Sequence, residues 1–190
     1  MRENLRREAE YWGNCVNTWV DEFKQMHYAV HMGIVNDYGS WPKFDLGGKS
    51  VIDLGGGPVS MLLKTKNTGR LTVVDPAPYP PWVRARYVSH GIQLLQVDAE
   101  SYRDDHAVYD ECWIYNTLQH TVNPADVARV ARRSSRRIRV FEWLEIEADD
   151  LHPHVLTLDG MNEWFEMEGE PVFGVNTAWG EDGEMAWTLS

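Results

Sequence analysis

The stretch VIDLGGGPVS, residues 51–60, decides the fold of this chain. An apolar strand that carries Asp53 runs into Gly55, Gly56 and Gly57, and a proline follows at the start of a predicted helix. A glycine-rich turn between a strand and a helix lets the backbone approach a nucleotide-like ligand. The turn matches the dinucleotide pattern G-x-G-x-x-G, except that Ser60 takes the place of the third glycine. It therefore predicts a ligand site but leaves the class of ligand open.

Two acids near this turn bear on the class of ligand. Asp75 lies about twenty residues after the turn, where a dinucleotide site carries its ribose-binding acid. Asp53, just before the first glycine, would repel a pyrophosphate, which binds backbone N–H groups and a helix N-terminus. The same carboxylate would attract a ligand with an ammonium group and a sulfonium, and S-adenosylmethionine is such a ligand. We therefore favour S-adenosylmethionine over a nicotinamide cofactor.

Length and composition indicate one soluble domain. The 190 residues suffice for one hydrophobic core, and no apolar run approaches the length of a membrane span. The first residues, MRENLRREAEYWGN, lack the apolar region of a secretory signal. We expect Cys15 and Cys112 to be reduced and buried in a cytoplasmic protein. The net charge of -11 disfavours nucleic acid as a partner, because such binding needs cations that neutralise phosphates.

The order of the predicted elements indicates a doubly wound α/β fold. Residues 1–34 predict one amphipathic helix that Gly33 ends. Further helices are expected at 58–66, at 82–89, from Pro124 after the cap Asn123, and after the cap Thr157; strands are expected at 50–54, 71–74, 92–97, 111–116 and 137–146. Residues 171–190 predict an antiparallel hairpin with a four-residue turn that contains Asp-Gly. The sequence thus predicts a mostly parallel seven-stranded sheet with a C-terminal antiparallel hairpin.

Four segments together resemble a known family. VIDLGGGPVSMLL resembles motif I of the class I S-adenosylmethionine-dependent methyltransferases, which have a Rossmann-like fold. LTVVDPAP resembles their second strand, whose terminal acid, here Asp75, holds both ribose hydroxyls. LLQVDAES resembles the third strand, where Asp98 accepts a hydrogen bond from the adenine amino group beside Ala99. The last glycine of the usual G-x-G-x-G loop is replaced by Val59, which we expect to narrow the methionine end of the site.

The segment YDECWIYNTLQHTVNP resembles the fourth strand of the family and the loop beyond it. The resemblance implies that Asn116 lies near the transferring methyl group, and that Gln119 and His120 face the acceptor. Histidine titrates near neutrality, so His120 is a candidate general base. The alternative is that His120 hydrogen-bonds a neighbouring backbone group and fixes the loop.

The resemblance covers residues 50–190 and implies a single domain, 1–190, in which a helical cover (1–48) precedes the Rossmann-like core (49–190). In the family such a leading helix often covers the cofactor, so Tyr11 and Trp12 are candidates to contact the sulfonium by cation–π interaction. His152 and His154 follow the fifth strand, in a region that borders the acceptor pocket in the family, so they are candidates to contact the acceptor; a hydrophilic loop without such a role is the favoured alternative.

The resemblance implies methyl transfer from S-adenosylmethionine to an O, N or S acceptor. We expect a small organic acceptor rather than nucleic acid. A homodimer is a further possibility that the sequence leaves undecided. The DPPY and Pro-Cys signatures of DNA methyltransferases are absent. No metal is expected, because His27 and His31, four residues apart, have no HExxH pattern around them. Two alternatives remain: a non-catalytic S-adenosylmethionine-binding partner of another enzyme, and a nicotinamide-dependent oxidoreductase.

Overall fold

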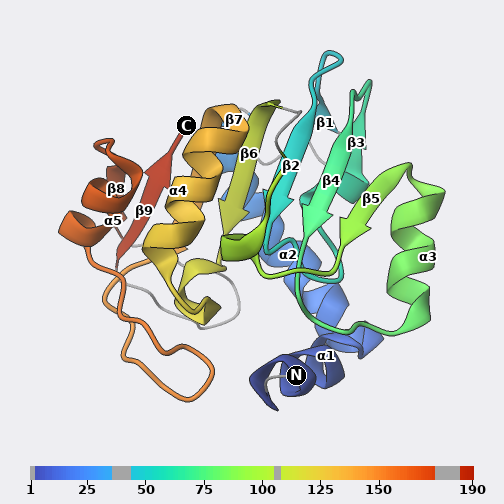
Figure 1. The fold of residues 1–190 in the computed structure, drawn as a ribbon, viewed down its shortest axis with the longest axis horizontal. Coiled ribbons are helices and arrows are strands. Elements are labelled where there is room, and N and C mark those ends of the chain that lie inside the picture. Colours follow the sequence, from blue (N-terminus) through green and yellow to red (C-terminus); the bar gives the residue numbers. More distant parts are fainter. Residues whose placement is uncertain (1–2, 36–43, 105–107, 174–184) are drawn as a thin grey trace.

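The computed structural model describes residues 3–35, 44–104, 108–173 and 185–190. A central sheet has the strand order β5-β4-β2-β6-β7-β9-β8, and Figure 1 shows it between layers of helices. The strands of this sheet are β2 (Val51–Leu54), β4 (Leu71–Val74), β5 (Ile92–Leu95), β6 (Tyr109–Tyr115), β7 (Ser135–Trp143), β8 (Glu170–Phe173) and β9 (Met185–Leu189). Two short strands, β1 (Phe44–Asp45) and β3 (Thr65–Lys66), pair with each other in parallel.

Strand β2, which leads into the glycine turn, lies inside the sheet. It pairs in parallel with β4 and β6, while β9 pairs antiparallel with β7 and with β8. The predicted mostly parallel sheet of seven strands with an antiparallel C-terminal end is therefore confirmed. The turn predicted between the last two strands lies outside the described residues.

The leading segment forms two helices, α1 (Glu3–Trp12) and α2 (Cys15–His31), so the prediction of one continuous helix is wrong. The break is at Gly13, whose N–H donates to the Ala9 carbonyl at 2.8 Å. A Cβ at Gly13 would lie 2.6 Å from the same carbonyl oxygen, so glycine permits this bend. Gly33, with φ of +63°, follows the end of α2 as predicted.

The helix predicted at 58–66 is also wrong. After the glycine turn the chain forms the short 3-10 helix η2 (Met61–Lys64) and then enters β3. The Ser60 hydroxyl caps η2 by accepting from the Leu62 N–H at 3.0 Å. Thr65 then takes extended backbone and pairs with Phe44 of β1, which stops the helix. Tertiary pairing has overridden the local helical pattern here.

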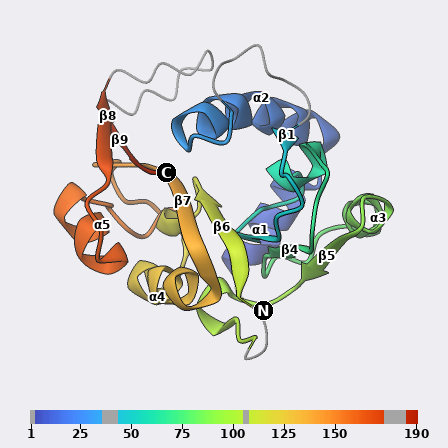
Figure 2. The same ribbon diagram turned by 90° about the horizontal axis from the view of Figure 1, so that it is seen from above.

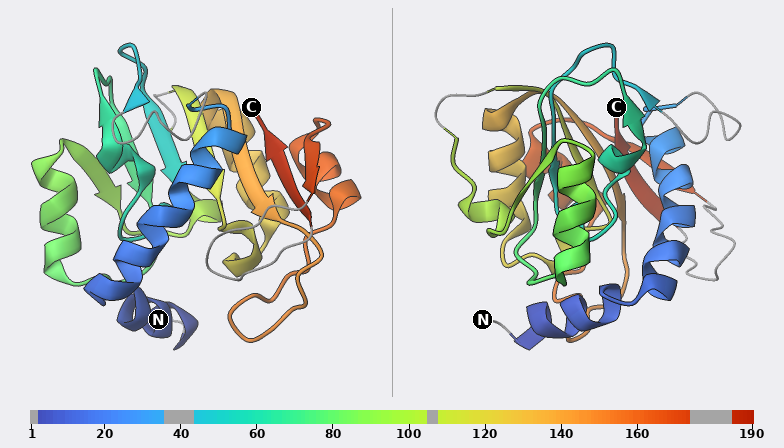
Figure 3. Two further views of the ribbon diagram at one scale, coloured as in Figure 1. Left: turned by 180° about the vertical axis from the view of Figure 1, so that it is seen from behind. Right: turned by 90° about the vertical axis from the view of Figure 1, so that its right-hand side faces the viewer.

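The remaining helices form as predicted and cover both faces of the sheet, as Figures 2 and 3 show. Helix α2 packs with α3 (Pro81–Ser89) on one face, while α4 (Pro124–Ser134) and α5 (Leu158–Phe165) pack on the other. The caps Asn123 and Thr157 accept from the N–H groups of Ala125 and Gly160 at 3.2 and 3.1 Å. Among the described helices, none has both the length and the apolar character to cross a membrane.

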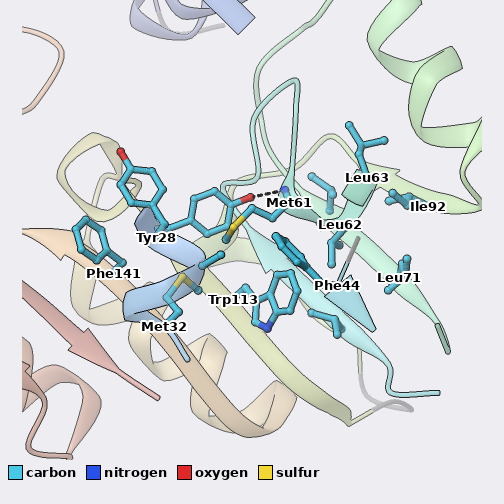
Figure 4. Packing of buried hydrophobic residues seen from close by; sticks show 14 of the residues in the cluster. Tyr28, Met32, Phe44, Met61, Leu62, Leu63, Leu71, Ile92, Trp113 and Phe141 are labelled. Atoms are coloured by element: carbon cyan, nitrogen blue, oxygen red, sulfur yellow. Dashed lines mark hydrogen bonds between the residues drawn. The ribbon is translucent and has the colours of Figure 1, made fainter. Parts of the chain in front are cut away.

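The core on the α2 face joins that helix to the sheet and to the segment after the glycine turn (Figure 4). Tyr28 stacks on Phe141 of β7, with ring centroids 4.7 Å apart. The Met61 N–H donates to the Tyr115 hydroxyl of β6 at 3.0 Å. Gln25 of α2 donates from Nε2 to the Val59 carbonyl at 2.5 Å. The glycine turn is therefore held by two elements remote in sequence.

Candidate active site

An open cleft lies at the carboxyl ends of the parallel strands, where open α/β sheets bind ligands. Its empty space, including open solvent at its mouth, is about 870 Å³. Its walls are residues 55–58, 75–76, 79, 98–100, 115–117 and 120–122, together with Leu5, Trp12 and Tyr28 of the two leading helices. Segments after four different strands thus meet at one site, and α1 and α2 close one side of it.

The glycine turn has a backbone that only small residues permit. Gly55 and Gly57 have φ of +80° and +63°. A Cβ at Gly55 would lie 2.1 Å from the Thr117 side chain, so glycine lets the loop after β6 approach. A Cβ at Gly57 would meet only the Tyr79 hydroxyl, at 4.0 Å, so this part of the turn borders open space. The turn therefore offers its backbone to a ligand in the cleft.

Asp53 lies beneath the turn and is absent from the cleft wall, contrary to the expectation that it faces the ligand. Its Oδ2 accepts from the hydroxyls of Ser60 at 2.5 Å and Tyr115 at 2.6 Å. A Cβ at Gly56 would lie 2.6 Å from the same oxygen. Burial raises the pKa of Asp53 to about 7, although the two hydroxyl donors act in the opposite direction. This carboxyl group therefore supports the turn from behind.

Val59 also differs from the expectation. Its side chain is fully buried, and it does not line the cleft. The residue that replaces the last glycine of the usual loop therefore points into the protein, and its carbonyl binds Gln25.

Asp75, directly after β4, and Asp98, three residues after β5, both lie in the cleft wall. The Oδ2 of Asp75 accepts from the Gly57 N–H at 3.0 Å, and its Oδ1 accepts from the Ala77 N–H at 2.9 Å. Asp98 and Ala99 stand at the start of the 3-10 helix η3 (Ala99–Ser101) and border the same cleft. The Asp75 carboxylate thus joins the glycine turn to the segment that follows β4.

Glu100 is a wall residue that sequence reasoning missed. Its Oε1 accepts from the Val122 N–H at 2.7 Å and from the Asn123 N–H at 3.3 Å. It therefore ties the segment after β5 to the end of the loop after β6. No motif marked it, because its partners are backbone groups far away in the sequence.

The loop after β6 contains Asn116, Gln119 and His120. Two of these residues line the cleft, and the third is buried behind it. Asn116 lines the cleft in a left-handed conformation, with φ of +50°. Gln119 is buried behind it and donates from Nε2 to the Asn116 Oδ1 at 3.3 Å. His120 lies in the cleft wall at the end of the 3-10 helix η4 (Leu118–His120). Gln119 therefore positions Asn116 and does not itself face the cleft.

A second buried acid, Glu142 of β7, holds this loop. Its Oε1 accepts from the N–H groups of Thr117 at 2.8 Å and Leu118 at 3.1 Å. Burial raises the pKa of Glu142 to about 7, while these two N–H groups and the charge of His120 act in the opposite direction. Sequence reasoning missed this residue as well. The only sequence feature that could have indicated its role is the position of an acid within the otherwise mostly apolar strand segment RVFEWL.

The loop 144–157 contacts His120 at the edge of the cleft. The His120 Nδ1 lies 3.1 Å from the Leu151 carbonyl oxygen, and its ring centroid lies 4.5 Å from that of His152. Because a carbonyl can only accept, we assign the proton of neutral His120 to Nδ1, which leaves Nε2 as the basic nitrogen. His154 Nε2 lies 2.9 Å from the carbonyl oxygen of Thr121. Both histidines of the loop thus lie near the cleft but outside its wall.

Trp12, and not Tyr11, lines the cleft from the leading helix. Tyr11 is 58% exposed and packs its ring edge-on against Trp12, with centroids 4.8 Å apart. On α2, burial lowers the pKa of both His27 and His31. Across the described ranges, no group of three or more His, Cys, Asp or Glu side chains could hold a metal ion.

The buried carboxyl of Asp53 predicts a pH-dependent stability. Its pKa is raised from 3.8 to about 7, so between these values the unfolded chain has released a proton that the folded chain retains. The free energy of unfolding should therefore fall as pH rises through this window. We expect Asp53→Asn to reduce the fall between about pH 5 and about pH 8 by about 1–3 kcal/mol, measured by urea unfolding. If the unfolding free energies of the wild type and the variant changed equally with pH, Asp53 would not be the source of the change. Part of the change should remain in the variant, because the pKa of Glu142 is also raised to about 7.

No protein-family model and no curated protein matches the sequence. Solved structures do match. The N-methyltransferase NodS from Bradyrhizobium japonicum, solved with S-adenosylhomocysteine, has a TM-score of 0.68 at 12% identity, over 98% of this chain and 96% of that chain. The plantazolicin methyltransferase BpumL, also solved with S-adenosylhomocysteine, has a TM-score of 0.58 at 8% identity, over 97% and 93%.

The [4+2]-cyclase SpnF has a TM-score of 0.54 at 18% identity, over 66% of this chain and 55% of that chain. Identities this low carry information about the fold alone. Together with the strand order and the cleft, these likenesses show that the chain has the fold of the class I S-adenosylmethionine-dependent methyltransferases.

Proposed function

We propose that the protein transfers a methyl group from S-adenosylmethionine to an O, N or S acceptor. The observation that carries the proposal is the composition of one cleft wall. It brings together the glycine turn, Asp75, Asp98, Ala99 and Asn116, which the sequence places after four different strands. NodS and BpumL, which share this fold, are methyltransferases solved with S-adenosylhomocysteine.

The residues of the wall fit S-adenosylmethionine. Each Asp75 oxygen accepts one backbone N–H, and a carboxylate oxygen can accept more than one hydrogen bond, which suits the binding of ribose hydroxyls. Asp98 lies in the wall and is the carboxylate that we assign to the adenine amino group, and Trp12 offers an aromatic face for a sulfonium. When bound, S-adenosylmethionine supplies an electrophilic methyl group on sulfur. Tyr11, which we had expected to contact the sulfonium, is less suited than Trp12 because it lies outside the wall.

A dinucleotide fits this turn less well. A pyrophosphate is stabilised by the N-terminus of a substantial helix, where the dipole and the free N–H groups point at the anion. Here the turn leads into the four-residue 3-10 helix η2, which supplies little of that dipole. We therefore place the nicotinamide-dependent oxidoreductase behind the methyltransferase.

His120 is the residue that we propose as general base. Its Nδ1–H is held by the Leu151 carbonyl, so Nε2 can take the proton of the acceptor while the acceptor atom bonds to the methyl carbon. The carbon–sulfur bond breaks in the same step, and its electron pair stays on sulfur. We assign Asn116, in the same wall, to the methyl end of the cofactor, where the reaction depends mainly on an in-line approach of the acceptor. Gln119 contributes by holding Asn116.

The charges in the wall favour a neutral or cationic small organic acceptor. Asp75, Asp98 and Glu100 line the cleft, and the described lining contains neither Lys nor Arg. A phosphate-rich acceptor such as nucleic acid would lack the cations it needs. We further propose a cytoplasmic location, and a homodimer in which a second copy covers the open cleft.

A non-catalytic S-adenosylmethionine-binding role is the second candidate. SpnF, which has a similar fold, is described as a [4+2]-cyclase, so this fold by itself does not establish methyl transfer. Such a protein would bind S-adenosylmethionine but transfer no labelled methyl group to any metabolite or macromolecule fraction.

We expect Asp75→Ala to weaken binding of S-adenosylhomocysteine by about 1.5–3 kcal/mol, because it removes a charged acceptor of hydrogen bonds. The measurement is isothermal titration calorimetry. Asp159→Ala serves as control, because Asp159 is exposed on α5 and does not line the cleft. If Asp75→Ala bound S-adenosylhomocysteine as tightly as the wild type, Asp75 would have only a structural role at the end of its strand.

We expect His120→Ala to lower the rate of methyl transfer at least about a hundredfold while thermal stability and S-adenosylhomocysteine affinity stay unchanged. The assay follows labelled methyl groups into the acceptor fraction that the wild type modifies. His90→Ala is the control, because His90 is exposed at the end of α3. Joint loss of stability and cofactor binding would assign His120 a structural role, and full activity would remove it from the mechanism.

A further inference from the structure

Glu142 carries a buried oxygen that its hydrogen bonds do not explain. The side chain is fully buried, and Oε1 alone accepts the N–H groups of Thr117 and Leu118. Oε2 is also buried and has no hydrogen-bond partner among the described residues. A carboxyl group in such a place costs free energy that an apolar side chain would not. Its place near the end of a buried strand, beside the loop that forms the cleft wall, points to a use of its carboxyl group.

The turn that Glu142 holds is the one that carries His120. The two bound N–H groups lie at the start of η4, and the His120 N–H donates to the Thr117 carbonyl at 3.0 Å. The imidazole lies close enough for its charge to lower the pKa of the Glu142 carboxyl. Both the position and the charge of His120 are therefore linked to one carboxyl group of the sheet.

We propose that Glu142 is a positioning residue for His120: its carboxylate fixes the turn that carries the imidazole and stabilises the imidazolium formed when His120 accepts a proton. The inference rests on the proposed function, in which His120 Nε2 receives the proton of the acceptor. The Leu151 carbonyl binds Nδ1–H. The ring is thus held by a backbone acceptor from loop 144–157, and the turn that carries it is held by the buried carboxyl of Glu142.

Asp98 and Glu100 line the same cleft as His120, and loop 144–157 brings further titratable groups to its ring. His152 packs its ring against that of His120, and its Nδ1 lies 2.9 Å from Asp149 Oδ1. Hydrogen bonds from the His152 side chain and from nearby backbone N–H groups lower the pKa of exposed Asp149 to about 2. Electrostatic coupling is mutual, so ionised Glu142 favours protonated His120 as much as protonated His120 favours ionised Glu142.

The test is an NMR titration of the His120 imidazole in the cofactor-free protein, which needs no acceptor. Glu142→Gln keeps an oxygen for the two N–H groups but removes the charge. We expect it to lower the titration midpoint of His120 by about 0.5–1 pH unit and to change S-adenosylhomocysteine affinity less than about threefold. Glu111→Gln is the matched control: Glu111 is also a buried strand glutamate, but its carboxylate binds Lys49 and Arg139. It should leave the His120 midpoint unchanged.

An unchanged midpoint in a folded Glu142→Gln variant would overturn the proposal. If that variant does not fold, NMR titration of both Glu142 and His120 in the wild type replaces it. Two coupled groups each show the same two inflections in their titration curves. Independent single inflections of Glu142 and His120 would then overturn it. If the His120 midpoint is lowered in Glu142→Gln but the wild type does not bind S-adenosylhomocysteine, the pairing is supported and the proposed function is rejected. The two failures are therefore distinguishable.

Discussion

The hydroxyl groups of Ser60 and Tyr115 both donate to one oxygen of Asp53, and the rest of the site depends on this buried junction. It ties β2, the end of the glycine turn and β6 together beneath the cleft. Tyr87 of α3 adds a second tie, because its hydroxyl accepts from the Ser60 N–H and donates to the Gly57 carbonyl. The turn is therefore fixed before any ligand arrives, which lowers the entropic cost of binding.

The glycine turn and the loop after β6 are supported in the same way. In each case a fully buried strand acid, Asp53 or Glu142, holds a loop whose outer residues line the cleft. Asp75 then links the turn to the next wall, and Glu100 links the segment after β5 to the loop after β6. The two fully buried acids support the loops from inside the protein, whereas Asp75, Asp98 and Glu100 lie in the cleft wall. This division explains why motif residues alone do not identify the ligand contacts.

The sequence was informative wherever structure follows from a local pattern. The apolar strands, the acids at their ends and the caps Asn123 and Thr157 were predicted because each depends on a few adjacent residues. The short helix η2 and the burial of Asp53 were not, because both depend on partners in β1 and β6. Glu100 and Glu142 escaped for the same reason, since their partners are backbone N–H groups of a distant loop.

The central claim is that this cleft binds S-adenosylmethionine and not a dinucleotide. Calorimetric titration of the wild-type chain with S-adenosylhomocysteine and, separately, with NAD tests it most directly. The account predicts saturable binding of one S-adenosylhomocysteine per chain and no heat of binding from NAD at the same concentrations. Saturable binding of NAD without binding of S-adenosylhomocysteine would contradict it.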